Sequence, residues 1–557
     1  MAHRTPKAGM QSPDDHKCSD PGATYRYRGL VARDKAFRSG RFWLPGAPEK
    51  AVGGWLDLSN RWPLLTLADP LIPSRRELSR TTSADGRVFV TVEPTEGVQP
   101  SDGRVIHGML RGPSRRITLV GLSDAGRSEV IGGVVHDPGE QRFRAEYMLM
   151  GPHQSGPEAK FTMARLQLRH LDSWAVLPGI AMELSEDWGQ ITARYERQAE
   201  ESVPVADGAK LSLSAEVTLR EPTLYGAGFQ RSAELWLDDP TGLTVTEWWR
   251  HFVAPMSELL TMTVGASCPP VALKLHREGT DEWIELHHPL LEKADGAPAL
   301  RPHEVFLTRK QLTLDHLAAW LAVSVSVAPI PALVAETINS PSRPLPSQLA
   351  EMAIAAEGLH RRLSPEARVM TRNQKNRARR RAAKAVSPLV RERVREALGH
   401  IEAPSYMERL RYLTDLTCEA IPDATRPDES HSAAGWEQRI KQVRNGFAHQ
   451  SPVTDGDIEN DTEWREQVVL LRTLYWVLAT ALLTRTGLDS SQIRTRTQSY
   501  EPYRALVRKA RLWIPDVYAP TTVDVPSTDL SEQTNEVTTV HRLPARPPEA
   551  VGWRWRP

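Results

Sequence analysis

Short segments in which apolar and polar residues alternate dominate the chain from about residue 36 to residue 335. Alternation with a period of two, or enrichment in β-branched residues, is typical of strands with one buried face. Gly, Pro, Asp and Ser stand between the segments, as expected for turns. We therefore predict antiparallel sheet, arranged as a sandwich or an open barrel. The predicted strands are 87–94, 115–123, 128–135, 143–151, 160–170, 189–198 and 209–222.

Two segments inside this region have helical patterns. Segment 244–265 can begin with Thr246 as its N-cap. Pro255 should kink or split this helix, because proline lacks an N–H and clashes with the preceding turn. Segment 313–327 is predicted to be helical at least in its first part.

The pattern changes to a helical period after the Pro- and Ser-rich stretch NSPSRPLPSQ (339–348). Segment 347–363 is predicted to be a helix with one apolar stripe. Segment 461–485 is apolar on most faces, so we predict that it is the central core helix, with Gly487 ending it. The stripe of the first helix consists of Leu349, Met352, Ala356, Leu359 and Leu363.

These patterns predict an α+β chain in which a β-rich region of antiparallel sheets with a few helices precedes an all-α bundle. Residues 1–35 and 519–557 are polar and Pro-rich, and we expect them to be disordered. The β-rich region is predicted to span 36–335, a linker 336–346, and the helical bundle 347–518.

Charge and cysteine usage narrow the class of protein. The formal net charge is +1, so any basic surface must be local. Cys18, Cys268 and Cys418 lie far apart, which fits a reducing compartment better than a disulfide framework. Segment 1–20 has no apolar core, and the longest apolar run, 474–483, is about half a membrane span. We expect a soluble, cytoplasmic protein with no membrane partner.

Several catalytic motifs do not occur in the sequence. It has no phosphate-binding Gly-x-x-x-x-Gly-Lys-Ser/Thr loop, no Gly-x-Ser-x-Gly elbow, no His-Glu-x-x-His and no Cys-x-x-Cys. His287 and His288 follow Glu282 and Glu285 and could bind a metal, but we favour a strand-end pair at the surface. We expect neither a metal nor an organic cofactor.

The stretch KQVRNGFAHQ (441–450) places Arg-Asn-x-x-x-His on a predicted helix. An Arg followed by a His five residues later is weak evidence by itself, because the chain repeats that spacing on a strand, at a frayed helix end and in a Pro-containing loop. Those three pairs are Arg165/His170, Arg395/His400 and Arg426/His431.

A helical wheel separates the candidate residues from the apolar face of this helix. Asn445 and His449 stack on the face opposite the apolar seam, and Arg444 lies on the flank. We therefore expect the helix to present all three side chains on the side away from its own bundle. His449 falls in the last turn, where the helix dipole favours a protonated imidazole. Three surface residues without a function are the simpler alternative. The seam consists of Trp436, Ile440, Val443 and Phe447.

At these residues the chain resembles a known family. Arg-Asn-x-x-x-His near the end of a late helix, with IAAEGLHRRL in helix 347–363, resembles the HEPN (higher eukaryotes and prokaryotes nucleotide-binding) domain, and specifically its Apea-like subgroup. Segments 40–59, 104–110 and 115–122 resemble the β-rich amino-terminal domain of ApeA-type antiphage defence proteins. The resemblance covers about 36–515.

The resemblance implies a metal-independent endoribonuclease that acts in antiphage defence by abortive infection. In that chemistry the 2′-OH of RNA attacks the adjacent phosphate, His449 exchanges the proton, and Arg444 binds the developing charge. Asn445 would orient the imidazole or bind phosphate, and Glu357 would support the site. The family also implies a homodimer or higher homo-oligomer, RNA (tRNA among the candidates) as substrate, and a phage-derived trigger bound by the front domain.

Two alternatives remain open at this stage. The basic run 372–384 could bind RNA through Arg377, Arg379, Arg380 and Arg381, or it could be a solvated basic loop. The bundle could also be a non-catalytic module that binds a nucleotide or partner protein, with the front domain carrying the function. His360 lies near an apolar stripe, and we interpret it as a core histidine.

Overall fold

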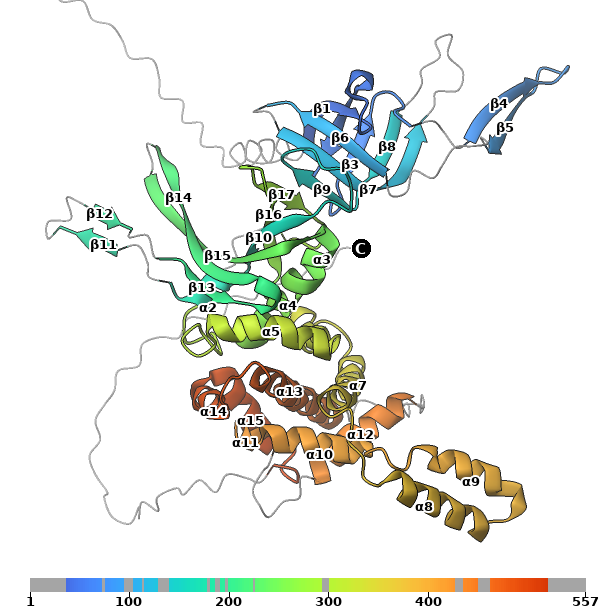
Figure 1. Cartoon of the computed structure of the whole chain (residues 1–557), viewed down its shortest axis with the longest axis vertical. Coiled ribbons are helices and arrows are strands. Elements are labelled where there is room, and N and C mark those ends of the chain that lie inside the picture. Colours follow the sequence, from blue (N-terminus) through green and yellow to red (C-terminus); the bar gives the residue numbers. More distant parts are fainter. Residues whose placement is uncertain are drawn as a thin grey trace, which may run out of the picture.

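The computed structural model confirms the α+β class, with a β-rich region above a helical bundle (Figure 1). The predictions for 1–35, 129–135, Arg426, His431 and 519–557 lie outside the described residues. The structure describes residues 37–72, 76–94, 104–112, 115–128, 140–177, 181–185, 191–195, 199–223, 226–292, 300–425, 434–448 and 461–518.

Six antiparallel strands at the start of the chain form a closed barrel, because the long strand β7 pairs with both β6 and β8. This differs from the predicted sandwich or open barrel, since closure depends on pairings between distant strands. Apolar side chains such as Phe42, Leu56 and Phe143 fill the interior. The barrel strands are β1 (Phe37–Trp43), β2 (Val52–Asp57), β3 (Leu64–Leu67), β6 (Arg104–Leu110), β7 (Arg115–Ser128) and β8 (Glu140–Arg144).

A second sheet grows from the barrel through β9, which also pairs with β7. Its order is β9-β17-β16-β10-β15-β14-β13, and every pairing is antiparallel. The pairs β4–β5 and β11–β12 form separate hairpins. The bounds are β4 (Arg76–Thr82), β5 (Val88–Pro94), β9 (Tyr147–Met150), β10 (Phe161–Leu168), β11 (Ala181–Leu184), β12 (Ile191–Arg194), β13 (Glu201–Pro204), β14 (Lys210–Thr223), β15 (Gly226–Leu243), β16 (Pro270–His276) and β17 (Ile284–His287).

A helix with a π-helical interruption covers this second sheet. It consists of α3 (Val245–Trp248), a π-helical segment (Trp249–Val253) and α4 (Ala254–Val264). The N-cap is Thr244, not Thr246, because Thr244 and Glu247 form a reciprocal capping box. The wider π turn directly precedes Pro255 and accommodates the missing N–H of this proline. The helix therefore continues through Pro255 and is not split.

Further helices continue from the β-rich region, called the front region below, into the bundle. Helix α7 carries the predicted stripe, with Leu363 only partly buried, and α13 is the predicted core helix. They are α2 (Leu171–Ala175), α5 (Leu314–Val327), α6 (Ile330–Asn339), α7 (Leu345–Leu363), α8 (Arg372–Ala385), α9 (Arg391–Ala397), α10 (Tyr406–Thr417), α11 (Pro422–Thr425), α12 (Ala434–Ala448), α13 (Asp461–Thr484), α14 (Ser490–Ser499) and α15 (Glu501–Trp513).

One continuous hydrophobic core joins the second sheet, its helices and the bundle. Helix α6 packs on α4, α7 and α13. Only 340–344 of the segment 336–346 lies between α6 and α7, because the rest belongs to the two helices. Gly265 ends α4 with a φ of 79°, and a Cβ there would lie 2.2 Å from the Tyr500 hydroxyl of the bundle. Front region and bundle are therefore closely packed.

Helix α13 is apolar along most of its length. By length and composition one helix among the described residues, Thr462–Thr484, is able to cross a membrane, and 78% of its apolar window is buried inside the fold.

Candidate functional site

Helix α12, which carries Arg444 and Asn445, is anchored to the core helix α13. The Trp436 indole N–H donates a 2.9 Å hydrogen bond to the Thr473 hydroxyl, and Ile440 is fully buried. Arg439 forms a 3.1 Å ion pair with Glu466. These contacts fix the helix before its last two turns, where the candidate residues lie.

A buried carboxylate supports the same helix from the side. Glu437 is fully buried and accepts a 3.1 Å hydrogen bond from Nε of Arg411 on α10. Burial raises the pKa of Glu437, although the Arg411 hydrogen bond and charge oppose the shift. Oε1 of Glu437 has no hydrogen-bond donor among the described residues. The helical wheel gave no sign of this contact.

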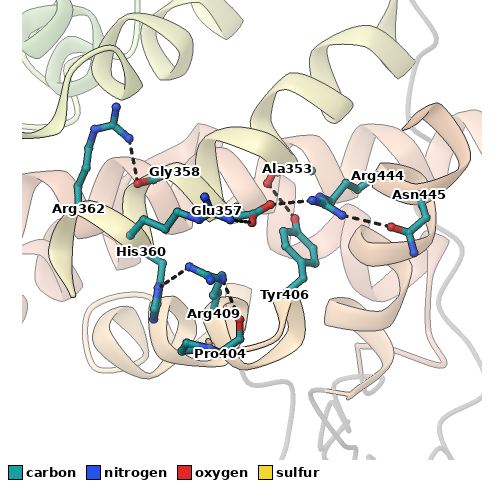
Figure 2. Close-up of polar contacts among 11 residues, drawn as sticks. Ala353, Glu357, Gly358, His360, Arg362, Pro404, Tyr406, Arg409, Arg444 and Asn445 are labelled. Atoms are coloured by element: carbon teal, nitrogen blue, oxygen red, sulfur yellow. Dashed lines mark hydrogen bonds and ion pairs between the residues drawn. The ribbon is translucent and has the colours of Figure 1, made fainter. Parts of the chain in front are cut away.

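Arg444 points toward Glu357 of α7 and Tyr406 of α10 (Figure 2). Its Nη2 lies 2.7 Å from Oε2 of Glu357, and its guanidinium carbon lies 4.8 Å from the centre of the Tyr406 ring. Nη1 contacts Oδ1 of Asn445 at 3.4 Å. Nε is buried and has no acceptor among the described residues. The guanidinium is thus held on two sides.

Glu357 serves two arginines at once. Its Oε1 accepts a 2.7 Å hydrogen bond from Arg361, one helical turn further along α7, while Oε2 pairs with Arg444. The carboxylate is mostly buried, with 18% of the side chain exposed. Both oxygens are engaged, so in this arrangement Glu357 acts as an ion-pair partner. The two guanidinium groups and one carboxylate leave a net charge of +1.

Tyr406 is the side chain of the site that the sequence did not reveal. Its hydroxyl donates a 3.0 Å hydrogen bond to the carbonyl of Ala353 on α7, and burial raises its pKa. The ring is therefore neutral and fixed beneath Arg444. A signal was present, because Ser405 and Glu408 form a capping box that begins a helix at Tyr406.

The prediction that Arg444 and Asn445 face away from their own bundle is wrong for Arg444. The wheel assumed one buried seam, but α12 packs against α7, α10 and α13, so more of its circumference is covered. Asn445 is half-buried. His449 lies outside the described residues, as does the Phe447 side chain, and α12 is described to Ala448.

His360 lies one turn from Glu357 and is a buried histidine, as predicted. It is 3% exposed, its Nδ1 lies 3.4 Å from Nη1 of Arg409, and it makes an edge contact with Tyr412. Burial, with the charges of Arg409 and Arg361, lowers its pKa, so the ring is neutral at pH 7.

The basic run is a helix, α8, that pairs with α9 in a hairpin projecting from the bundle (Figure 1). Arg377, Arg380 and Arg381 are exposed, whereas Arg379 is half-buried. Of the α8 side chains, all of which the structure describes, only Ala383 is buried. The interpretation as a basic loop is wrong, because a Thr371–Gln374 capping box begins a regular helix.

The histidine pair at the end of β17 is less exposed than predicted. His287 lies 3.6 Å from Glu285, and Glu282 pairs instead with Arg116 at 2.6 Å. His288 stacks on Trp249 with a centroid distance of 4.6 Å. No group of three metal-ligating side chains occurs among the residues that the structure describes.

Two parts of the chain match known protein families. Residues 38–321, from the barrel into α5, match the family described as ApeA N-terminal domain 1. The chain belongs to the ApeA family. Residues 350–492, from α7 to the start of α14, match the Apea-like HEPN family. This matched range contains Glu357, Tyr406, Arg444 and Asn445. An Apea-like HEPN domain indicates a nuclease-like or nucleotide-binding role in antiphage defence. No curated protein and no solved structure matches the chain.

The ion pair between Glu357 and Arg444 should contribute measurably to stability. Glu357→Gln should lower the free energy of unfolding by about 1–2 kcal/mol, because the substitution leaves Arg361 and Arg444 without their counter-charge. This value lies between those of exposed and of buried ion pairs. Urea unfolding followed by circular dichroism measures the change. The matched control is Glu351→Gln on the same helix, whose ion pair with Arg343 is more exposed and should cost less than about 1 kcal/mol. Equal losses in the two variants would contradict this account.

Proposed function

We propose that this ApeA-family chain is a metal-independent endoribonuclease of antiphage defence. The observation that supports the proposal is Arg444, which begins the Arg-Asn-x-x-x-His motif inside the Apea-like HEPN range. Glu357 and Tyr406 hold it in a fixed position. A guanidinium fixed in this way loses little side-chain entropy when it binds a phosphate, so it is suited to stabilising charge in a transition state.

The proposed reaction uses a nucleophile that RNA itself supplies. The 2′-oxygen attacks the adjacent phosphorus and its proton passes to His449, while the bond from phosphorus to the 5′-oxygen of the next nucleotide breaks. The leaving 5′-oxygen takes a proton from a general acid, for which we propose His449 of a second chain. The products are a 2′,3′-cyclic phosphate and a 5′-hydroxyl. Arg444 stabilises the charge on the non-bridging oxygens, helped by the net positive charge of the Glu357–Arg361–Arg444 group. Asn445 orients the imidazole or binds phosphate.

Cleavage should depend on Arg444 and His449 and should not require a divalent cation. We expect Arg444→Lys and His449→Ala each to lower the rate of RNA cleavage by at least ~100-fold, the effect of removing a transition-state contact or a proton-transfer group. The measurement is cleavage of labelled RNA and a DNA of equal sequence in EDTA, with analysis of the new ends. DNA should stay intact because it lacks the 2′-OH.

Gln442→Ala is the control, because Gln442 is an exposed residue of the same helix. The proposal fails if both folded variants cleave RNA like the wild type, or if activity requires Mg²⁺ or Mn²⁺. Retained phage protection in these variants would favour the alternative, a non-catalytic nucleotide- or partner-binding bundle with the function in the front domain.

We also propose that the active species is a homodimer or higher oligomer in which two HEPN bundles form one site. The motif supplies one histidine per chain, whereas this reaction needs a base and an acid. A chain carrying His449→Ala, mixed at increasing ratio with a fixed amount of wild type and given time for subunit exchange, should lower activity below that of the wild type alone. Unchanged activity across the titration, with a monomeric mass for the active species, would remove the composite site.

The α8–α9 hairpin is proposed to bind the RNA backbone. Replacing the exposed Arg377, Arg380 and Arg381 with Gln should reduce the slope of log K against log salt by about 2, since each phosphate contact contributes ~0.7 for single strands. Binding of a fluorescent RNA is measured between low and physiological salt. The charge-matched control replaces Arg494, Arg504 and Arg508, which are exposed on α14 and α15. Equal slopes in the two triple variants would exclude this role.

A further inference from the structure

A cavity of about 550 Å³ lies in the front region, between the π-interrupted helix, the turn from α5 to α6, and the strand ends at β9 and β17. This volume falls in the range of sites that hold small organic molecules. Val325, at its rim, is 62% exposed, so the cavity opens to solvent. Neither the chemistry of Arg444 nor the basic hairpin involves this cavity.

The walls combine apolar surface with two carboxyls, of which Glu146 is exposed and Glu258 is half-buried. Trp249, Pro255, Val325 and Pro329 supply apolar lining, whereas Glu258 contributes a carboxyl from the middle of α4. No described residue donates a hydrogen bond to that carboxyl or pairs with it. Burial raises the pKa of Glu258 to about 7. A half-buried carboxyl without a protein partner is free to accept a hydrogen bond from a ligand that enters the cavity.

The aromatic part of the wall is fixed. His288 stacks on Trp249 at 4.6 Å and its Nδ1 accepts a hydrogen bond from the backbone N–H of Leu290. Burial, with the charge of Arg61, lowers the pKa of His288 to about 4, so it is neutral at pH 7. The histidine therefore gives Glu258 no counter-charge, and the indole is a rigid surface for a flat ligand.

We propose that this cavity binds a small molecule with a flat, mainly apolar body and a protonated amine or N–H donor group, which Glu258 receives. The apolar wall takes the body, and the unpartnered carboxyl selects the donor. Two sources share this chemistry: an aromatic amine, which brings a charge, and a guanine-type base, which offers two neutral N–H groups side by side.

The site lies close to the candidate nuclease centre. Pro331 and Ala332 of α6 line the cavity, and the side chain of the adjacent Ile330 packs against Gly358, next to Glu357. Its Cδ1 lies 3.0 Å from the position of a Cβ on Gly358. One helix thus separates the proposed ligand from the carboxylate that holds Arg444.

Isothermal titration calorimetry on the full chain tests the proposal without reference to nuclease activity. The probes are tryptamine, guanosine and indole-3-propionic acid, which has the same ring as tryptamine and the opposite charge. We expect at least one donor probe to bind with a Kd below ~1 mM, and the acid to bind at least ~10-fold more weakly than the donor. If tryptamine binds more tightly, the donor that Glu258 receives is a cation. If guanosine binds more tightly, the donor is a pair of neutral N–H groups.

Two substitutions and the pH dependence locate the binding. Glu258→Gln should raise the Kd of tryptamine about 10-fold or more, because it removes a charge-assisted hydrogen bond. Val325→Trp places a larger side chain at the opening of the cavity and should raise the Kd of every probe. Raising the pH from 6 to 8 ionises Glu258, so the affinity for tryptamine should rise by up to about 10-fold per unit below pH 7.

Controls separate Glu258 from the other titratable groups that face the cavity. Glu146→Gln and His251→Gln should leave the rise with pH in place. Absence of binding by both donor probes, equal binding of the acid, or an unchanged Kd in Glu258→Gln would each overturn the proposal, and none of these results bears on RNA cleavage. The other titratable groups that face the cavity are Glu146, Tyr147, Arg250, His251 and His288.

Discussion

The packing of Trp476 at the middle of α13 is the contact on which the rest of the structure depends. Its ring meets Phe306 from the front region at 4.8 Å and Tyr503 from α15 at 5.0 Å. Buried aromatic side chains contribute several kcal/mol each to stability. Because α7 and α12 also pack on α13, the geometry around Arg444 is set by a core that extends into the second sheet. The HEPN bundle and the β-rich region share this interior.

The electrostatics of the candidate site follow from partial burial. Glu357, Arg361 and Arg444 form a group with one negative and two positive charges, and the Tyr406 ring and the Glu357 carboxylate hold the Arg444 guanidinium in place. An isolated Arg on a helix surface would sample many rotamers, and ordering it on a ligand would cost free energy. The ion pair and the Tyr406 ring have already paid that cost during folding.

The sequence predicted the local elements well, because period-two and helical patterns are recorded residue by residue. The strand at β10, the stripe on α7 and the core helix α13 are examples. Barrel closure could not be predicted, since it requires β7 to pair with β6 along its first part and with β8 along its last part. The orientation of Arg444 was mispredicted for a similar reason. A helical wheel shows which residues share a face, but not how many neighbouring helices cover it.

The hairpin of α8 and α9 illustrates how a bundle can tolerate variation. It adds almost nothing to the core, because Ala383 is the one buried side chain of α8. Its two ends return to the bundle near Val369 and Glu402, whose backbones are joined by a hydrogen bond of 2.9 Å. We therefore expect a change of length or charge between these two points to alter the free energy of folding little. The arm can therefore be lengthened, shortened or recharged without disturbing the packing of the rest of the bundle.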